Sequence, residues 1–119
     1  HINKDDLFRS IGRNYIQLAK EEPNLFRIFI LHKREGIASL DDLYRTEASR
    51  ELAEVIAEDL HISVPAARRL HLNMLIYTIG LGTVFSVTSP GISADEIYAQ
   101  QEIAYEAFLK SETDCRKET

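Results

Sequence analysis

Residues 65–88, PAARRLHLNMLIYTIGLGTVFSVT, decide the fold. The stretch opens with Arg68, Arg69 and His71, but from Leu72 onward almost all of its side chains are apolar. A helix of this kind has almost no face suited to water, so it must be covered on nearly every side. The other helices of a 119-residue chain can cover only part of it. We therefore expect a second copy of the chain, or a bound apolar molecule, to cover the rest.

The composition limits the class of protein. A length of 119 residues fits one domain with a single core. The formal net charge of -5 argues against these residues holding nucleic acid by themselves, because that affinity comes mainly from Lys and Arg side chains that neutralise phosphates. Cys115 is the only cysteine, so no intrachain disulfide can form, and the chain suits a reducing, cytoplasmic compartment.

The same apolar stretch raises the question of a membrane span. Residues 72–87 are somewhat shorter than the roughly 20 residues that a bilayer requires, and they include Asn73 and two glycines. A buried helix and no membrane contact is therefore the favoured interpretation. A membrane span is the lesser alternative.

The rest of the chain predicts an all-α fold, because no stretch alternates apolar and polar residues as a half-buried strand does. Residues that start or end helices stand at Asn3, Pro23, Asn24, Gly36, Ser39, Ser63 and Ser93. We predict a five-helix bundle with helices over residues 4–22, 25–35, 40–60, 64–88 and 94–110. The domain then spans residues 1–110, and the polar residues 111–119 form a disordered tail.

The sequence shows no catalytic or metal-binding motif. Such a site needs a nucleophile with a base, a pair of carboxylates in different environments, or a cluster of ligands. The spacing of His32, His61 and His71 matches no ligand pattern, so we read them as surface or linker residues. We accordingly expect no enzyme activity, no cofactor and no metal.

A few polar and small residues interrupt the apolar helix. Asn73, Tyr77 and Thr78 either bond to another helix or project into a cavity and orient a ligand there. Glycine inside a helix costs up to about 1 kcal/mol relative to alanine, so Gly80 and Gly82 need a packing reason. We expect that they let another helix approach closely.

Residues 52–70 read like a helix-turn-helix, with a short turn and two arginines at the start of the second helix. A recognition helix, however, must leave its outer face open to the groove, and this one becomes apolar on all sides within two turns. Glu51, Glu54 and Glu58 on the first helix would also repel phosphates. A stand-alone DNA-binding domain using residues 52–70, or a helical protein-interaction module, is therefore the alternative function.

Three segments together resemble a known family: residues 15–29, YIQLAKEEPNLFRIF; residues 75–87, LIYTIGLGTVFSV; and residues 93–109, SADEIYAQQEIAYEAFL. They are similar to the C-terminal regulatory domain of TetR-family transcriptional repressors. The resemblance implies a homodimer that binds a small apolar effector. It also implies DNA binding only through an N-terminal helix-turn-helix unit that is not among these residues. Ile79 stands where related chains often have a His before the glycine, so a ligand contact from that His is not expected.

Helical angles divide the long apolar helix and its neighbours between the two tasks. We predict that one arc, together with the last helix, forms a four-helix dimer interface through Leu72, Leu75, Ile79, Gly82, Ser86, Ile97, Tyr98, Gln101, Tyr105 and Phe108. We predict that the opposite arc and the first three helices line the effector cavity through Phe8, Ile11, Tyr15, Phe26, Phe29, Ile30, Tyr44, Asn73, Met74, Tyr77, Leu81 and Phe85. The alternative is that these inward aromatic residues fill a solid core.

Overall fold

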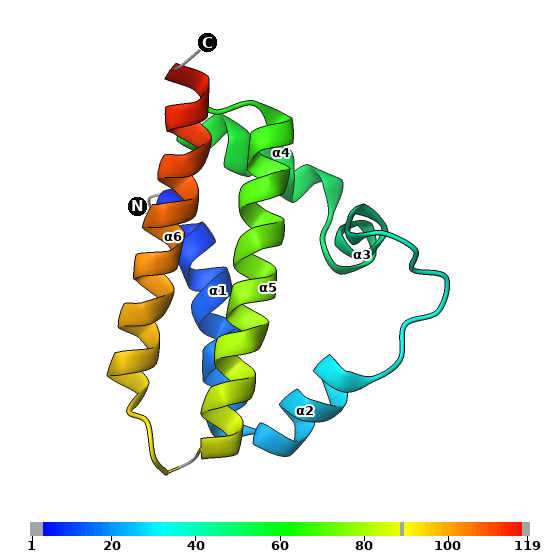
Figure 1. Ribbon diagram of the computed structural model, residues 1–119, viewed down its shortest axis with the longest axis vertical. Helices are drawn as coiled ribbons and strands as arrows, with labels where there is room; N and C mark the ends of the chain where they lie inside the picture. The colour runs from blue at the N-terminus through cyan, green and yellow to red at the C-terminus, as the bar shows by residue number, and fades with distance from the viewer. Residues whose placement is uncertain (1–3, 89, 118–119) are drawn as a thin grey trace.

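The computed structural model describes residues 4–88 and 90–117, and side chains within residues 8–88 and 90–113. No strand occurs in these ranges, so the predicted all-α class is confirmed. The described residues form six helices, not five: α1 (Lys4–Glu21), α2 (Pro23–Leu31), α3 (Leu40–Glu47), α4 (Arg50–Leu60), α5 (Val64–Thr88) and α6 (Ala94–Lys117). Figure 1 shows α1, α5 and α6 running side by side, with α4 near one end of α5 and α2 near the other.

The central element is α5, which packs against α1, α2, α4 and α6. One apolar cluster joins α1, α4, α5 and α6 around Leu70 and Met74, and a second joins Ile16, Phe85 and Ile97. Among the described residues, α5 is the one helix long and apolar enough to cross a membrane, and 44% of its most apolar window is buried. Packing against four other helices places α5 at the centre of the bundle, but more than half of its most apolar window is not buried.

The predicted helix over residues 40–60 is in fact two helices. Ala48 is extended, with φ -135° and ψ 147°, and the Ser49 hydroxyl accepts a hydrogen bond from the Leu52 amide at 3.1 Å. A serine in this position satisfies one of the amides that a helix start leaves without a partner, so it begins a new helix. The predicted cap at Ser39 is confirmed, because its hydroxyl accepts from the Asp42 amide at 3.0 Å.

The second helix begins and ends earlier than predicted. It starts at Pro23, and Asn24 does not cap it; the Asn24 side chain instead accepts a hydrogen bond from Arg27. It ends at Leu31, five residues before the expected stop at Gly36. Gly36 does adopt a positive φ of 75°, but in a turn between α2 and α3. The predicted cap at Asn3 lies outside the described residues.

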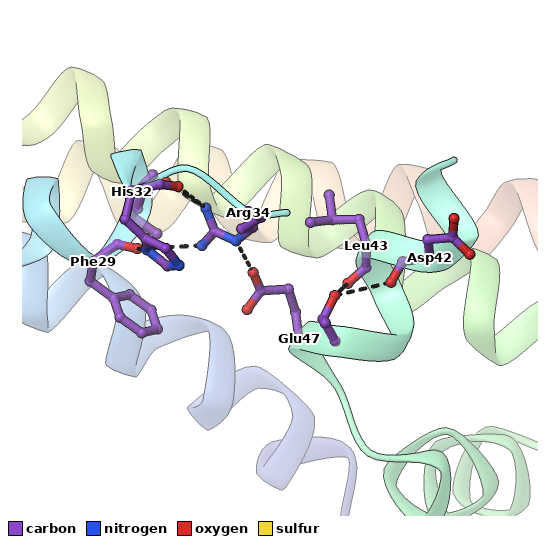
Figure 2. A network of polar contacts seen from close by, with 8 residues as sticks. Phe29, His32, Arg34, Asp42, Leu43 and Glu47 are labelled. Atoms are coloured by element: carbon purple, nitrogen blue, oxygen red, sulfur yellow. Dashed lines mark hydrogen bonds and ion pairs between the residues drawn. The ribbon is translucent and has the colours of Figure 1, made fainter. Parts of the chain in front are cut away.

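Arg34 explains where α2 stops. Its guanidinium donates to the carbonyls of Phe29, Ile30 and His32 at 3.3, 2.9 and 3.1 Å, which are groups that the end of a helix leaves without amide partners. The same guanidinium pairs with the Glu47 carboxylate at the end of α3. Figure 2 shows Arg34 between the end of α2 and Glu47. One side chain therefore holds the α2–α3 connection.

Replacing Arg34 with glutamine should loosen this connection without unfolding the bundle. Charge-assisted hydrogen bonds to partly buried groups are lost, so exchange of the amides in the last turn of α2, residues 28–31, is expected to become about tenfold faster. Lys33→Gln is the matched control, because the Lys33 ammonium is exposed and lies 3.8 Å from Glu35. Equal exchange rates in the two variants would contradict this role for Arg34.

The polar C-terminal residues extend the last helix. We predicted disorder over residues 111–119, but α6 continues to Lys117. Arg69 on α5 forms an ion pair with Glu112 at 2.9 Å, and the Glu112 side chain is only 10% exposed. This contact gives the polar end of α6 a partner on α5, which composition alone did not reveal.

Candidate functional site

A small cavity lies between α1, α5 and α6. Its walls come from the apolar or aromatic residues Phe8, Ile11, Tyr15, Met74, Leu75 and Tyr105 and from the polar or charged residues Arg9, Arg13, His71, Thr78, Gln101 and Glu102. The cavity holds about 40 Å³. A water molecule needs at least roughly 10–15 Å³ of such space, whereas small-molecule sites typically measure about 300–1,000 Å³. In this conformation the cavity holds a few waters at most, and a larger ligand would have to open it.

A buried histidine stands at one end of this cavity. His71 is 7% exposed, and its Nδ1 is hydrogen-bonded to the Tyr44 hydroxyl at 2.7 Å. Two rings meet the imidazole edge-on, Phe8 at 5.6 Å and Tyr44 at 5.1 Å between centroids. Burial lowers the pKa of His71 to about 4, because the charged form loses its hydration. The imidazole is therefore neutral at pH 7 and can both donate and accept a hydrogen bond.

A second buried polar pair lies further along α5. Gln101 on α6 donates from Nε2 to the Thr78 hydroxyl at 3.1 Å, and both side chains are buried. Gly12 on α1 makes room for the pair, since a Cβ at that position would lie 2.8 Å from Gln101 Nε2. This close approach is a packing reason for Gly12, whose role no sequence motif indicated.

An ion pair lies at the edge of the cavity. Arg9 on α1 donates from Nε and Nη2 to the two carboxylate oxygens of Glu102 on α6, at 2.9–3.0 Å. Their side chains are 27% and 33% exposed, so the pair sits between water and the interior. The Arg9 guanidinium also lies 4.7 Å from the centre of the Tyr105 ring. A two-pronged Arg–carboxylate pair of this kind fixes the spacing of α1 and α6 at the cavity.

The structure brings together only part of the predicted effector site. Of the twelve predicted residues, those that line the cavity are Phe8, Ile11, Tyr15 and Met74. The others lie elsewhere: Phe26 and Phe85 are buried outside it, Tyr44 reaches it only through His71, Asn73 and Phe29 are exposed, and Ile30, Tyr77 and Leu81 are half-buried away from it.

Two polar interior residues lie elsewhere than the sequence predicted. His71 was expected at the surface or in a linker but is buried against the cavity. Gln101 was assigned to the dimer interface but is buried inside the subunit against Thr78. Both side chains are polar and line the cavity, so they can orient a ligand there.

The residues predicted to face a symmetry mate mostly face the chain's own core. Six of the ten are buried within the subunit: Leu75, Gly82, Ser86, Ile97, Gln101 and Tyr105. The other four are half-buried: Leu72, Ile79, Tyr98 and Phe108. Gly82 shows the reason, because a Cβ there would lie 2.5 Å from the Phe26 ring of α2. The close approach expected at this glycine occurs within one chain.

The exposed side of α5 is a different arc. Asn73, Ile76, Gly80, Val84 and Val87 are all exposed. On an α-helix these positions fall within an arc of about 80°, and we call them the outer stripe. Ile76, Val84 and Val87 are 44%, 44% and 63% exposed. Beside α5, the neighbouring helix α6 exposes Ile103 at 58%.

Within the ranges that the structure describes, no group of three His, Cys, Asp or Glu side chains could hold a metal ion. Comparison of the chain with protein-family models, with curated proteins and with solved structures gave no match.

Proposed function

We propose that this chain is the effector-sensing and homodimerisation domain of a TetR-like transcriptional repressor. The sequence resemblance suggests the family, and the helical bundle around α5 is compatible with it. The observation that carries the proposal is the outer stripe. An apolar arc along more than three turns of the central helix stays open to water, and such a patch marks an interaction site.

Pairing through the outer stripe replaces the interface predicted from helical angles. Gly80 lies in the middle of the stripe with nothing within 4 Å of a Cβ built there, so the backbone of a second helix can approach it closely. Ile76, Val84 and Val87 flank it with apolar surface. Two copies related by a twofold axis would each contribute α5 and α6, which gives a four-helix interface.

Sensing is assigned to the cavity between α1, α5 and α6. An apolar effector that enters it must move these helices apart, because about 40 Å³ cannot hold an organic molecule. The effector binds only the opened conformation and so shifts the population toward it. Since α5 and α6 also form the proposed interface, the shift changes the spacing of DNA-binding units carried by the two subunits.

The alternative of a stand-alone helix-turn-helix is less well supported. In α5, Ala66 and Ala67 are buried, and the two arginines that follow pair with Asp41 and Glu112. Because this first turn of α5 packs into the core of the chain, it is poorly placed to enter a DNA groove. The proposed function predicts no retardation of DNA by the isolated chain, whereas retardation with a steep salt dependence would favour the alternative.

One observation favours a protein-interaction module as a second candidate. Leu25, Ile28 and Leu31 on α2 are 54%, 70% and 70% exposed and recur every three residues. A short helix with such a face can dock in a groove of another protein. This function and dimerisation through α5 use different surfaces.

The pairing part of the proposal is tested by Val84→Glu. A carboxylate in the centre of an apolar interface must be buried or must separate the two copies, so the dimer dissociation constant is expected to rise at least about tenfold. Val55→Glu on α4 is the matched control, because Val55 is 37% exposed and Val84 is 44% exposed. Sedimentation velocity over a range of concentrations measures the dimer dissociation constant of each variant. Unchanged association of Val84→Glu, or equal loss in both variants, would refute this interface.

A further inference from the structure

A larger hollow lies on the other side of Tyr44, between α3, α4 and α5. This groove measures about 580 Å³, and Tyr44, Arg45, Arg50, Val64 and Arg68 are among the residues that line it. Its volume falls within the range of about 300–1,000 Å³ that is typical of small-molecule sites. In this conformation, therefore, the groove has room for an organic ligand and the interior cavity does not.

The groove carries an excess of positive charge. Its lining includes three arginines and no acidic residue, in a chain whose formal net charge is -5. Asp41 lies beside it and is shared, 2.9 Å from the Arg45 guanidinium and 2.6 Å from that of Arg68. Arg50 has a looser contact of 3.6 Å with Glu54. The groove therefore has three guanidinium groups but only two neighbouring carboxylates in contact with them, which leaves positive charge in excess.

The same groove has an apolar part. Arg68 lies over the Tyr44 ring at 5.0 Å from its centre, so one face of the ring is already covered by a cation–π contact. Val64 is 41% exposed and Ala48 is half-buried, whereas Tyr44 and Ala53 are buried, so Val64 and Ala48 supply the accessible apolar surface. Arginine forks bind carboxylate and phosphate oxygens in pairs, while the alkyl surface suits a short hydrocarbon.

We propose that the groove between α3, α4 and α5 binds a small amphipathic organic anion, with its carboxylate held by Arg45, Arg50 and Arg68 and its apolar part against Ala48 and Val64. Tyr44 links this groove to the interior, since its hydroxyl is bonded to His71. Binding in the groove is therefore expected to change the environment of the His71 ring. That the bound anion acts as an effector rests on the function proposed above, whereas the binding itself does not.

The test is a titration of the ¹⁵N-labelled chain, followed by NMR at low ionic strength, with hexanoate as the probe. We expect saturable shifts of the amides of Arg45, Ala48 and Val64 and of the His71 ring. Arg50→Gln and Arg68→Gln are each expected to raise the dissociation constant about three- to tenfold. Lys20→Gln, an equal change of charge at an exposed site on α1, should leave it unchanged. The Arg50 side chain is 87% exposed, so the Arg50 variant keeps the fold.

Two further probes define the ligand class. Hexanamide has the same hydrocarbon without the charge, and inorganic phosphate has charge without hydrocarbon; each is expected to bind at least about threefold more weakly than hexanoate. Equal binding of either probe would overturn the proposed class. The absence of saturable shifts in the groove, or an equal effect of Lys20→Gln, would overturn the site. These results do not depend on association of the chain, which tests the proposed function separately.

Discussion

Gly82→Ala is expected to lower the free energy of unfolding by about 1–2 kcal/mol, whereas Gly80→Ala is expected to raise it by about 0.5–1 kcal/mol. Both changes add one methyl group to α5 and gain helix propensity. At Gly82 the new Cβ would lie 2.5 Å from the Phe26 ring, and Phe26 is fully buried, so the ring cannot move aside freely. At Gly80 a Cβ has nothing within 4 Å. The two glycines therefore respond with opposite signs.

The free energy of unfolding of each glycine variant is measured by urea denaturation, with circular dichroism as the signal. Both substitutions are made in the Val84→Glu background, because Gly80 belongs to the proposed interface and pairing would otherwise add to the measured stability. If the two glycine variants changed the stability in the same direction, the packing of α2 over Gly82 would be wrong.

His71 should make the fold sensitive to acid. Burial holds its pKa at about 4 in the folded chain, compared with the ordinary value of 6.5. Because the folded pKa is the lower one, the contribution of His71 is fully present above about pH 6.5 and is lost as the pH falls toward about 4. A difference of this size corresponds to about 3 kcal/mol of unfolding free energy.

The comparison that isolates this effect uses a double variant. His71→Leu alone would leave the buried Tyr44 hydroxyl without its partner, so Tyr44→Phe is added. The carboxylates, including Glu102 beside the same cavity, are the same in both proteins, so the difference between the two pH profiles reports on His71. We expect the double variant to lose about 3 kcal/mol less between pH 7 and pH 4. Parallel profiles would show that His71 is not held neutral by burial.

Local signals in the sequence were sufficient for much of the fold. The all-α class and the caps at Ser39, Ser63 and Ser93 were predicted, and each serine hydroxyl accepts the amide three residues on. Ser49 offered the same signal and was overlooked within a continuous apolar pattern. The early end of α2 was not predictable in this way, because Arg34 joins it to Glu47 across a loop.

The orientation of α5 was the main error, and its cause is physical. The helix is apolar on nearly all sides, so its sequence pattern does not say which arc faces inward. The arc containing Gly82 faces inward because α2 packs there, which is a tertiary contact. His71, in contrast, was within reach of prediction. It shares a stripe with Ala67, Met74 and Thr78, all buried, whereas the prediction considered only its spacing from the other histidines.

The central claim is that α5 is completed by a second copy of the chain. Sedimentation equilibrium of the unaltered protein tests it most directly. We expect a species of about 27 kDa, twice the 13.6 kDa of one chain, that dissociates on dilution into a single lighter form. A mass of 13.6 kDa that stays constant up to the highest soluble concentration would contradict the claim.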